Sequence, residues 1–357
     1  MKKKISFPHM GNYYIPLKYL LTHITKYEVM EAPPITKRTL EIGSKHSPDF
    51  VCIPFKYNLG NFIECLEKGA NILVQAGGGC RYGYYAEVQQ QILKDLGYEF
   101  EFINILSIRK KGIIPFYREL KKISKGVFFL KKIYYLLLTI KMVSILDDIE
   151  KYIRKNIGFE ETEGSFDKIH KEFLDGLKDI KNFRHLNKTK KAYERKFRTI
   201  KINKPSNCLK VGIIGELYTI MEPSSNYYLE KELAKNNIEI TRFTTLTYLL
   251  FKKKRYEKKH IKQAGKYLKY HIGADGTESV SIAKRLAELK YDGIIHAKPF
   301  GCMPEVNAMP ILQNISNNYK IPILYFSFDS QTSETGIKTR LEAFYDMLLM
   351  RKEKSNE

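Results

Sequence analysis

The sequence predicts an α/β protein built from two parallel-sheet domains with a helical insert between them. Short apolar runs of strand type alternate with stretches of helical spacing in residues 1–106, and again in residues 205–357. Residues 107–204 have apolar residues at helical spacing and no strand-like run. The length of 357 residues also exceeds the size at which a single hydrophobic core usually stops growing.

The first domain is expected to contain three strands. The apolar runs that predict them are residues 49–55, 71–76 and 98–106. Helical spacing predicts helices over residues 58–68 and 84–96, and Gly97 follows the second helix as a typical C-terminal residue. Because strands and helices alternate, the strands are expected to form a parallel sheet that is covered by helices.

The insert is expected to be helical and strongly basic. Ile133, Leu137 and Ile140 recur at the spacing of one helix face. Residues 107–204 contain 26 basic and 12 acidic residues, so the exposed face of the insert is expected to carry most of the excess lysine. The last part of the insert, residues 188–204, is expected to be a connector to the second domain.

The second domain shows the same alternation of strands and helices. Four strands are expected, at residues 209–214, 238–243, 292–297 and 321–326. Helices are expected between and after them, at residues 226–236, 279–289, 305–316 and 336–351. Arg340 is expected to anchor the last of these helices.

The chain is basic as a whole. Lys and Arg outnumber Asp and Glu by 61 to 39, which gives a formal net charge of +22. A basic surface of this size can attract nucleic acid, acyl-CoA phosphates or an acidic protein partner. An AT-rich coding sequence is a second explanation, because the chain is rich in Lys, Ile, Asn and Tyr and has no Trp. No RNA-recognition, zinc-finger or helix-turn-helix pattern accompanies the charge, so nucleic acid is not the expected partner.

The sequence predicts neither a transmembrane helix nor a secretory signal. The longest apolar stretch, residues 126–146, is interrupted by Lys131, Lys132 and Lys141. Residues 1–5 carry the charge of a secretory signal, but no long apolar region follows them. The protein is therefore expected in the cytoplasm, without a membrane partner.

Five cysteines are the first candidates for chemistry: Cys52, Cys65, Cys80, Cys208 and Cys302. None forms Cys-x-x-Cys, which excludes the bacterial ferredoxin run and the common zinc knuckles. An odd number in a cytoplasmic protein also argues against a disulfide framework. Cys65, in the middle of a predicted helix, and Cys208, at the start of a predicted strand, are expected to be structural.

The other three cysteines lie near the carboxyl ends of predicted strands. Cys52 lies late in its strand, Cys80 follows a strand and a glycine triplet that ends at Gly79, and Cys302 follows the strand 292–297. Ligands of parallel sheets bind beyond the carboxyl ends of the strands. Thiolates select zinc or iron–sulfur clusters over hard metals, and three thiolates suit a [4Fe-4S] cluster that leaves one iron open.

Two carboxylates near the same edge are the candidates for a catalytic acid. Glu305 follows Cys302 by three positions, and is expected either to cap the helix that begins there or to act as an acid near the cluster. Glu216, at a strand end, is expected either to be structural or to orient a substrate. Arg81 is expected either to raise the cluster potential or to pair with a carboxylate. His296 has no partner signature in the sequence, so it is expected to be a core or surface histidine.

Four segments carry a resemblance to a known family. The most specific are residues 299–305 (Pro-Phe-Gly-Cys-Met-Pro-Glu) and 339–344 (Thr-Arg-Leu-Glu-Ala-Phe). Gly215-Glu216-Leu217-Tyr218 and Gly77-Gly78-Gly79-Cys80-Arg81 are also similar. Together they resemble the 2-hydroxyacyl-CoA dehydratase family, which includes the 2-hydroxyglutaryl-CoA dehydratase D-component, and within it the acyl-CoA dehydratase activase-related branch. The resemblance covers roughly residues 40–106 and 207–348.

The resemblance implies an oxygen-sensitive protein with flavodoxin-like domains and a [4Fe-4S] cluster held by Cys52, Cys80 and Cys302. In this family an ATP-hydrolysing iron–sulfur activase delivers a low-potential electron. Dehydratase members use it to form a ketyl radical from a 2-hydroxyacyl-CoA, whereas relatives with a bridged double cluster reduce small molecules. Dehydratases pair two related subunits, so a related subunit or a homodimer is also implied.

Three functions follow from these observations. The first is an activase-fed redox enzyme component that acts on an acyl-CoA or another small molecule. The second is an iron–sulfur electron-transfer subunit without catalysis of its own. The third is a basic nucleic-acid-binding protein whose cysteines are structural, and a steep loss of oligonucleotide affinity with salt would identify it.

Overall fold

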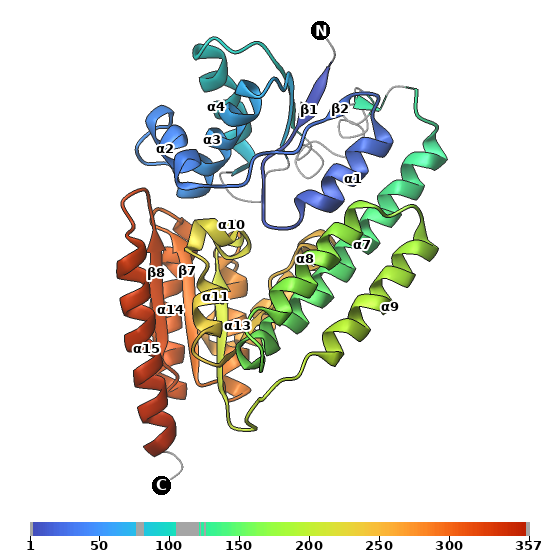
Figure 1. Cartoon of the computed structure of the whole chain (residues 1–357). Coiled ribbons are helices and arrows are strands. Elements are labelled where there is room, and N and C mark those ends of the chain that lie inside the picture. Colours follow the sequence, from blue (N-terminus) through green and yellow to red (C-terminus); the bar gives the residue numbers. More distant parts are fainter. Residues whose placement is uncertain (1–2, 76–81, 105–120, 122, 125, 355–357) are drawn as a thin grey trace. The chain divides into compact units, whose positions relative to one another are not determined.

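The computed structural model describes residues 3–75, 82–104, 121, 123–124 and 126–354 (Figure 1). The chain divides into two compact units, Met1–Met142 and Val143–Glu357. The division falls inside a long helix, α7 (Phe129–Asn156), which belongs to the predicted helical region. Each unit contains one four-stranded parallel sheet with helices around it, which confirms the predicted α/β class.

The first unit is built on a sheet with the strand order β2-β1-β3-β4. Its strands are β1 (Lys4–Ser6), β2 (Glu28–Val29), β3 (Ile72–Gln75) and β4 (Glu101–Asn104). Its helices are α1 (Tyr14–Ile24), α2 (Lys37–His46), α3 (Ile53–Glu67) and α4 (Tyr82–Asp95). All three strand pairs are parallel. Strands β3 and β4 and helices α3 and α4 were predicted, whereas the short β1 and β2 were not.

The predicted strand over residues 49–55 is wrong, because helix α3 already begins at Ile53. Pro54 is the second residue of this helix, where a missing N–H costs no intrahelical hydrogen bond. The short apolar run therefore marks the buried start of a helix. Because α3 leads directly into β3, the N-terminus of α3 lies toward the carboxyl end of that sheet, so Cys52 keeps its predicted placement for a different reason.

The second unit has the equivalent strand order, β6-β5-β7-β8. Its strands are β5 (Leu209–Gly215), β6 (Ile238–Arg242), β7 (Gly293–Pro299) and β8 (Ile323–Phe328). All four agree with the predicted strands, and all pairs are parallel. The order is that of flavodoxin-like sheets, in which ligands bind at the carboxyl edge where the first and third strands lie side by side.

Helices cover both faces of the second sheet (Figure 1). They are α10 (Leu217–Met221), α11 (Leu229–Ala234), α12 (Lys253–Ala264), α13 (Gly276–Glu288), α14 (Met303–Tyr319) and α15 (Glu334–Lys354). Side chains of α13 and α14 pack on Ile214 and Ile294, whereas Phe344 and Leu348 of α15 contact Gly293 from the other face. The guanidinium of Arg340 donates to the Tyr325 carbonyl (2.7 Å), so this arginine anchors α15 as predicted.

The described part of the insert is helical, as predicted. After α7 it contains α8 (Ser165–Lys178) and α9 (Phe183–Thr199). Most of the predicted connector, residues 188–204, is therefore helix, because Leu186 and Phe197 supply a buried apolar face beneath the basic one. Arg184, Lys191 and Arg198 lie exposed on α9, which places part of the excess charge on the solvent face.

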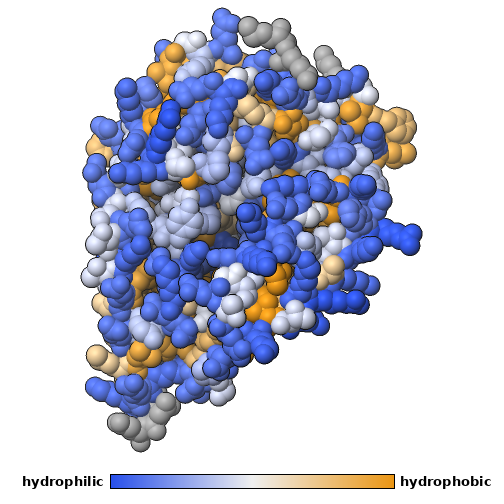
Figure 2. Space-filling view, viewed as in Figure 1, coloured by the Kyte–Doolittle hydropathy of each residue, from blue (hydrophilic) through white to orange (hydrophobic). Residues whose placement is uncertain are grey.

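The surface is largely hydrophilic on the face shown in Figure 2. Among the helices that the structure describes, none combines the length and apolar character needed to cross a bilayer.

Candidate functional site

Three helices of the second unit begin at the carboxyl edge of its sheet with a polar residue directly before each. Glu216 precedes α10, Asp275 precedes α13, and Cys302 precedes α14. Strands β5 and β7 are parallel neighbours, with Gly215 opposite Ala297, so α10 and α14 follow strands that end at the same edge. The sequence identified Glu216 and Cys302, but Asp275 carried no recognisable motif.

Glu216 caps α10. Its carboxylate accepts hydrogen bonds from the backbone N–H groups of Tyr218 (3.1 Å) and Thr219 (2.9 Å), and from the Thr219 hydroxyl (2.7 Å). Burial, and then the neighbouring Asp275, raise the pKa of Glu216 to about 7, although the bonds from Thr219 and Tyr218 act in the opposite direction. Asp275 also contacts this helix start, because it accepts from the Leu217 N–H (3.1 Å).

The raised pKa of Glu216 predicts a pH-dependent stability. The folded pKa of about 7 lies above the ordinary value of 4.5, so the folded state binds more protons between these values. The free energy of unfolding should therefore fall as pH rises from 4.5 to 7, by about 1–3 kcal/mol from this group. In Glu216→Gln, the free energies of unfolding by urea at pH 5 and pH 8 should differ less than they do in the wild type, because this group no longer titrates. Equal pH profiles in both proteins would contradict the prediction.

Cys302 presents a half-buried thiol at the start of the 17-residue helix α14. Burial is the main cause that raises the pKa of this thiol far above its usual range, and Glu216, Glu305 and Asp275 raise it further. The hydrogen bond from the backbone N–H of Glu305 lowers the pKa of Cys302, but this effect is smaller than the effects that raise it. The protonated thiol is therefore the favoured form, and a thiolate would form here only beside a positive charge such as that of a bound metal centre.

Glu305 does not cap α14, so the capping prediction is wrong. Its side chain is fully buried and points to His296, with 2.6 Å between Glu305 Oε2 and His296 Nε2. Its other oxygen accepts from the Ser279 hydroxyl on α13 (3.1 Å). His296 is fully buried, so it is a core histidine, and Glu305 is the partner that the sequence did not signal. Capping rules consider only the helix itself, whereas here a neighbouring strand and a neighbouring helix supply the partners.

Lys298 is a buried cation that the sequence did not single out. It lies on β7, with its ammonium 2.9 Å from the Ser327 hydroxyl that accepts its hydrogen bond. Burial lowers the pKa of Lys298, and Cys302 and Glu305 partly oppose this effect. One lysine among many in a basic chain carries no signal by itself, so only the fold identifies it as a neighbour of the site.

The first unit repeats the local arrangement around Cys302. Cys52 is half-buried and directly precedes the 15-residue helix α3. Both cysteines begin a Cys-x-Pro sequence, with Pro54 or Pro304 as the second helical residue. A helix N-terminus offers backbone N–H groups and a partial positive charge to a sulfur ligand. The helix placement is therefore favourable for a metal thiolate at both positions.

The two cysteines expected to be structural are buried. Cys65 is fully buried in α3, where its sulfur accepts a hydrogen bond from the Ser6 hydroxyl (3.2 Å). Burial raises the pKa of Cys65 to about 11. Cys208 is buried directly before β5. Neither offers an accessible sulfur, which agrees with their predicted role.

The remaining predicted site residues, Gly79, Cys80 and Arg81, lie outside the described residues. Within the described parts of the chain, no group of three or more His, Cys, Asp or Glu side chains is arranged to hold a metal ion. The three-cysteine set stays a prediction, because one of its members is not described.

Comparison with known proteins bears on the second unit. Residues 266–348 match the family "2-hydroxyglutaryl-CoA dehydratase, D-component". No curated protein matches the chain. The matched segment contains Ser279, His296, Lys298, Cys302 and Glu305, whereas Glu216 and Cys52 lie outside it. The match confirms the resemblance over residues 266–348, where a domain of the 2-hydroxyglutaryl-CoA dehydratase D-component family is found.

Proposed function

We propose that this chain is a [4Fe-4S] component of a 2-hydroxyacyl-CoA dehydratase-like system, with Cys52, Cys80 and Cys302 as cluster ligands. The observation that carries the proposal is Cys302, a half-buried thiol at a helix start inside the family-matched segment. Burial and the acidic neighbours favour the protonated thiol, so a thiolate ligand here would need the positive charge of a bound metal centre beside the sulfur. Thiolate ligands select iron–sulfur clusters or zinc, and the family match favours the cluster.

The charges around Cys302 suit a centre of low reduction potential. Glu216, Glu305 and Asp275 all act on the Cys302 sulfur. Negative charge near a cluster disfavours the addition of an electron and so lowers its potential. The positive charge of Lys298 has the opposite effect and raises the potential. A cluster in this environment would supply one-electron transfer, and its reduction would need a strong electron donor.

This requirement supports an ATP-hydrolysing activase as the partner that delivers the electron. ATP hydrolysis can supply the energy to drive an electron to such a low potential. Because ATP is available in the cytoplasm, we propose that the system works there. The family match adds a related subunit or a second copy of this chain as a partner, and a 2-hydroxyacyl-CoA or another small molecule as substrate. Glu216 is the nearby carboxyl group that could hold a proton for such chemistry, because burial raises its pKa to about 7.

The test is the metal content of protein purified without oxygen. We expect about four iron and four acid-labile sulfide per chain, with a visible absorbance that bleaches when dithionite is added. Activase that has itself been reduced, together with ATP, should then replace dithionite as the source of the electron. Protein that contains no iron, and takes up none on reconstitution, would contradict the proposal. Bleaching by activase without turnover of any 2-hydroxyacyl-CoA would favour an electron-transfer subunit.

A further inference from the structure

A buried polar cluster ties three elements together beside Cys302. Glu305 on α14 contacts His296 on β7 (2.6 Å) and Ser279 on α13 (3.1 Å), and all three side chains are buried. We call these three residues the clip. His296 precedes the connection that carries Cys302, and Glu305 follows it in the first turn of the helix. The clip therefore fixes this connection on both sides.

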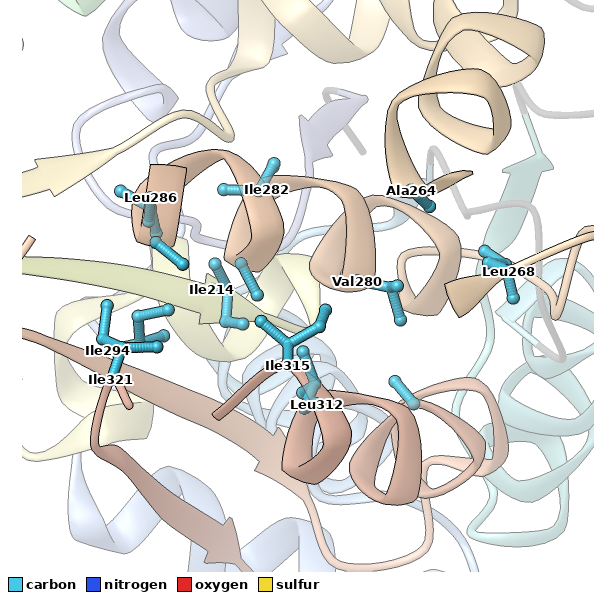
Figure 3. Close-up of a cluster of buried hydrophobic side chains, with 13 residues drawn as sticks. Ile214, Ala264, Leu268, Val280, Ile282, Leu286, Ile294, Leu312, Ile315 and Ile321 are labelled. Carbon is cyan, nitrogen blue, oxygen red and sulfur yellow. The ribbon is translucent and has the colours of Figure 1, made fainter. Parts of the chain in front are cut away.

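The apolar core beneath the clip already holds the same elements. Figure 3 shows side chains of α13, α14, β5 and β7 packed against one another. Val280 and Leu286 of α13 belong to the same core as Leu312 and Ile315 of α14, and all four are fully buried. The two helices also approach closely at their N-termini, because a Cβ atom at Gly276 would overlap the Pro304 carbonyl. Packing alone thus holds the helices in place.

The clip is not expected to stabilise this core more than apolar side chains would. Replacing a buried polar pair with apolar residues of similar volume is often neutral or stabilising. The Nδ1 atom of His296 is buried and has no hydrogen-bond partner among the described residues. Features that break a local rule of folding without stabilising the protein are expected at functional sites.

We propose that Ser279, Glu305 and His296 are positioning residues that hold the connection between β7 and α14, and with it the Cys302 sulfur, in one place. The inference rests on the proposed function, because a fixed ligand matters most where a cluster is bound and changes its charge. It assigns the clip no contact with substrate. The clip acts on Cys302 through the first turn of α14, because Cys302 directly precedes that helix.

Two serines on α13 provide a matched test. Ser279 donates to Glu305, whereas Ser281, two residues later, contacts Nδ1 of His260 (2.9 Å). Both are buried on the same helix, so Ser279→Ala and Ser281→Ala each remove one buried hydroxyl contact. The measurement is the rate at which iodoacetamide alkylates Cys302 in the metal-free full chain, followed on the Cys302 peptide by mass spectrometry.

We expect Ser279→Ala to raise the Cys302 alkylation rate about fivefold, the ratio that corresponds to one typical hydrogen bond of about 1 kcal/mol. Ser281→Ala should lower the thermal midpoint about as much as Ser279→Ala does, but it should leave the Cys302 alkylation rate unchanged. Ser279→Thr, which keeps the hydroxyl, should restore the wild-type rate. Equal rates in Ser279→Ala and Ser281→Ala, or an unchanged rate in Ser279→Ala, would overturn the inference.

The iron-loaded protein gives a second readout. Ser279→Ala should shift the midpoint potential or the EPR signal of the reduced centre, and Ser281→Ala should change neither. Iron binding with no difference between the two variants would overturn the positioning role and leave the proposed function intact. A fivefold change in alkylation in a chain that binds no iron would support the positioning role and contradict the proposed function.

Discussion

Cys302→Ala is expected to lose its iron and acid-labile sulfide almost completely. Cys302 is half-buried at the start of α14, so its sulfur is available to a metal. Removing one of three thiolates leaves a cluster with two protein ligands, too few to retain it. The content should fall from about four iron per chain to near zero in anaerobically purified protein.

Cys65→Ala is the matched control for this experiment. Cys65 is fully buried in α3 and is bonded to Ser6, so its sulfur is not available to a cluster. This variant should keep its full iron content while it loses some stability through the small cavity it creates. Iron that survives in Cys302→Ala, or disappears equally in both variants, would refute the assignment of Cys302 as a ligand.

Gly215→Ala is expected to give the largest loss of stability. Gly215 ends β5 with a φ of 138°, a conformation that residues with a side chain rarely adopt. A Cβ atom there would also overlap the carbonyl oxygen of Ala297, which accepts the hydrogen bond from the Glu216 N–H (3.0 Å). The backbone strain and the lost contact together should cost roughly 3 kcal/mol or more, measured by urea unfolding.

Gly301→Ala provides the comparison, since Gly301 lies next to Cys302 in the same unit. A Cβ atom at this exposed position would meet no atom within 4 Å. Its unfolding midpoint should stay close to that of the wild type. If Gly215→Ala unfolds at the same urea concentration as Gly301→Ala, the close approach of β5 to Ala297 is not a constraint on this protein.

The sequence was most informative where local patterns decide the structure. Periodicity located the four strands of the second unit and most of its longer helices, because an apolar face of fixed period is a local property. The same pattern placed Cys302 after a strand at the carboxyl edge of a parallel sheet. It failed over residues 49–55, where a short apolar run fits the start of a buried helix as well as a strand. It also missed β1 and β2, which are too short to show a period.

The chemical environment of the site depended on contacts between distant parts of the chain. Ser279, His296 and Glu305 lie on three elements, and Asp275 and Glu216 meet across 59 positions of sequence. Each of these residues is unremarkable within its own element, and local rules even suggested a helix cap for Glu305. Lys298 is one of many lysines in the sequence, and only its burial in the folded chain shows its place beside the site. The sequence by itself therefore determined the fold class, the family resemblance of residues 266–348 and Cys302 as the candidate ligand. The tertiary structure alone decided which charges surround the Cys302 sulfur, because those contacts form only when strands and helices pack.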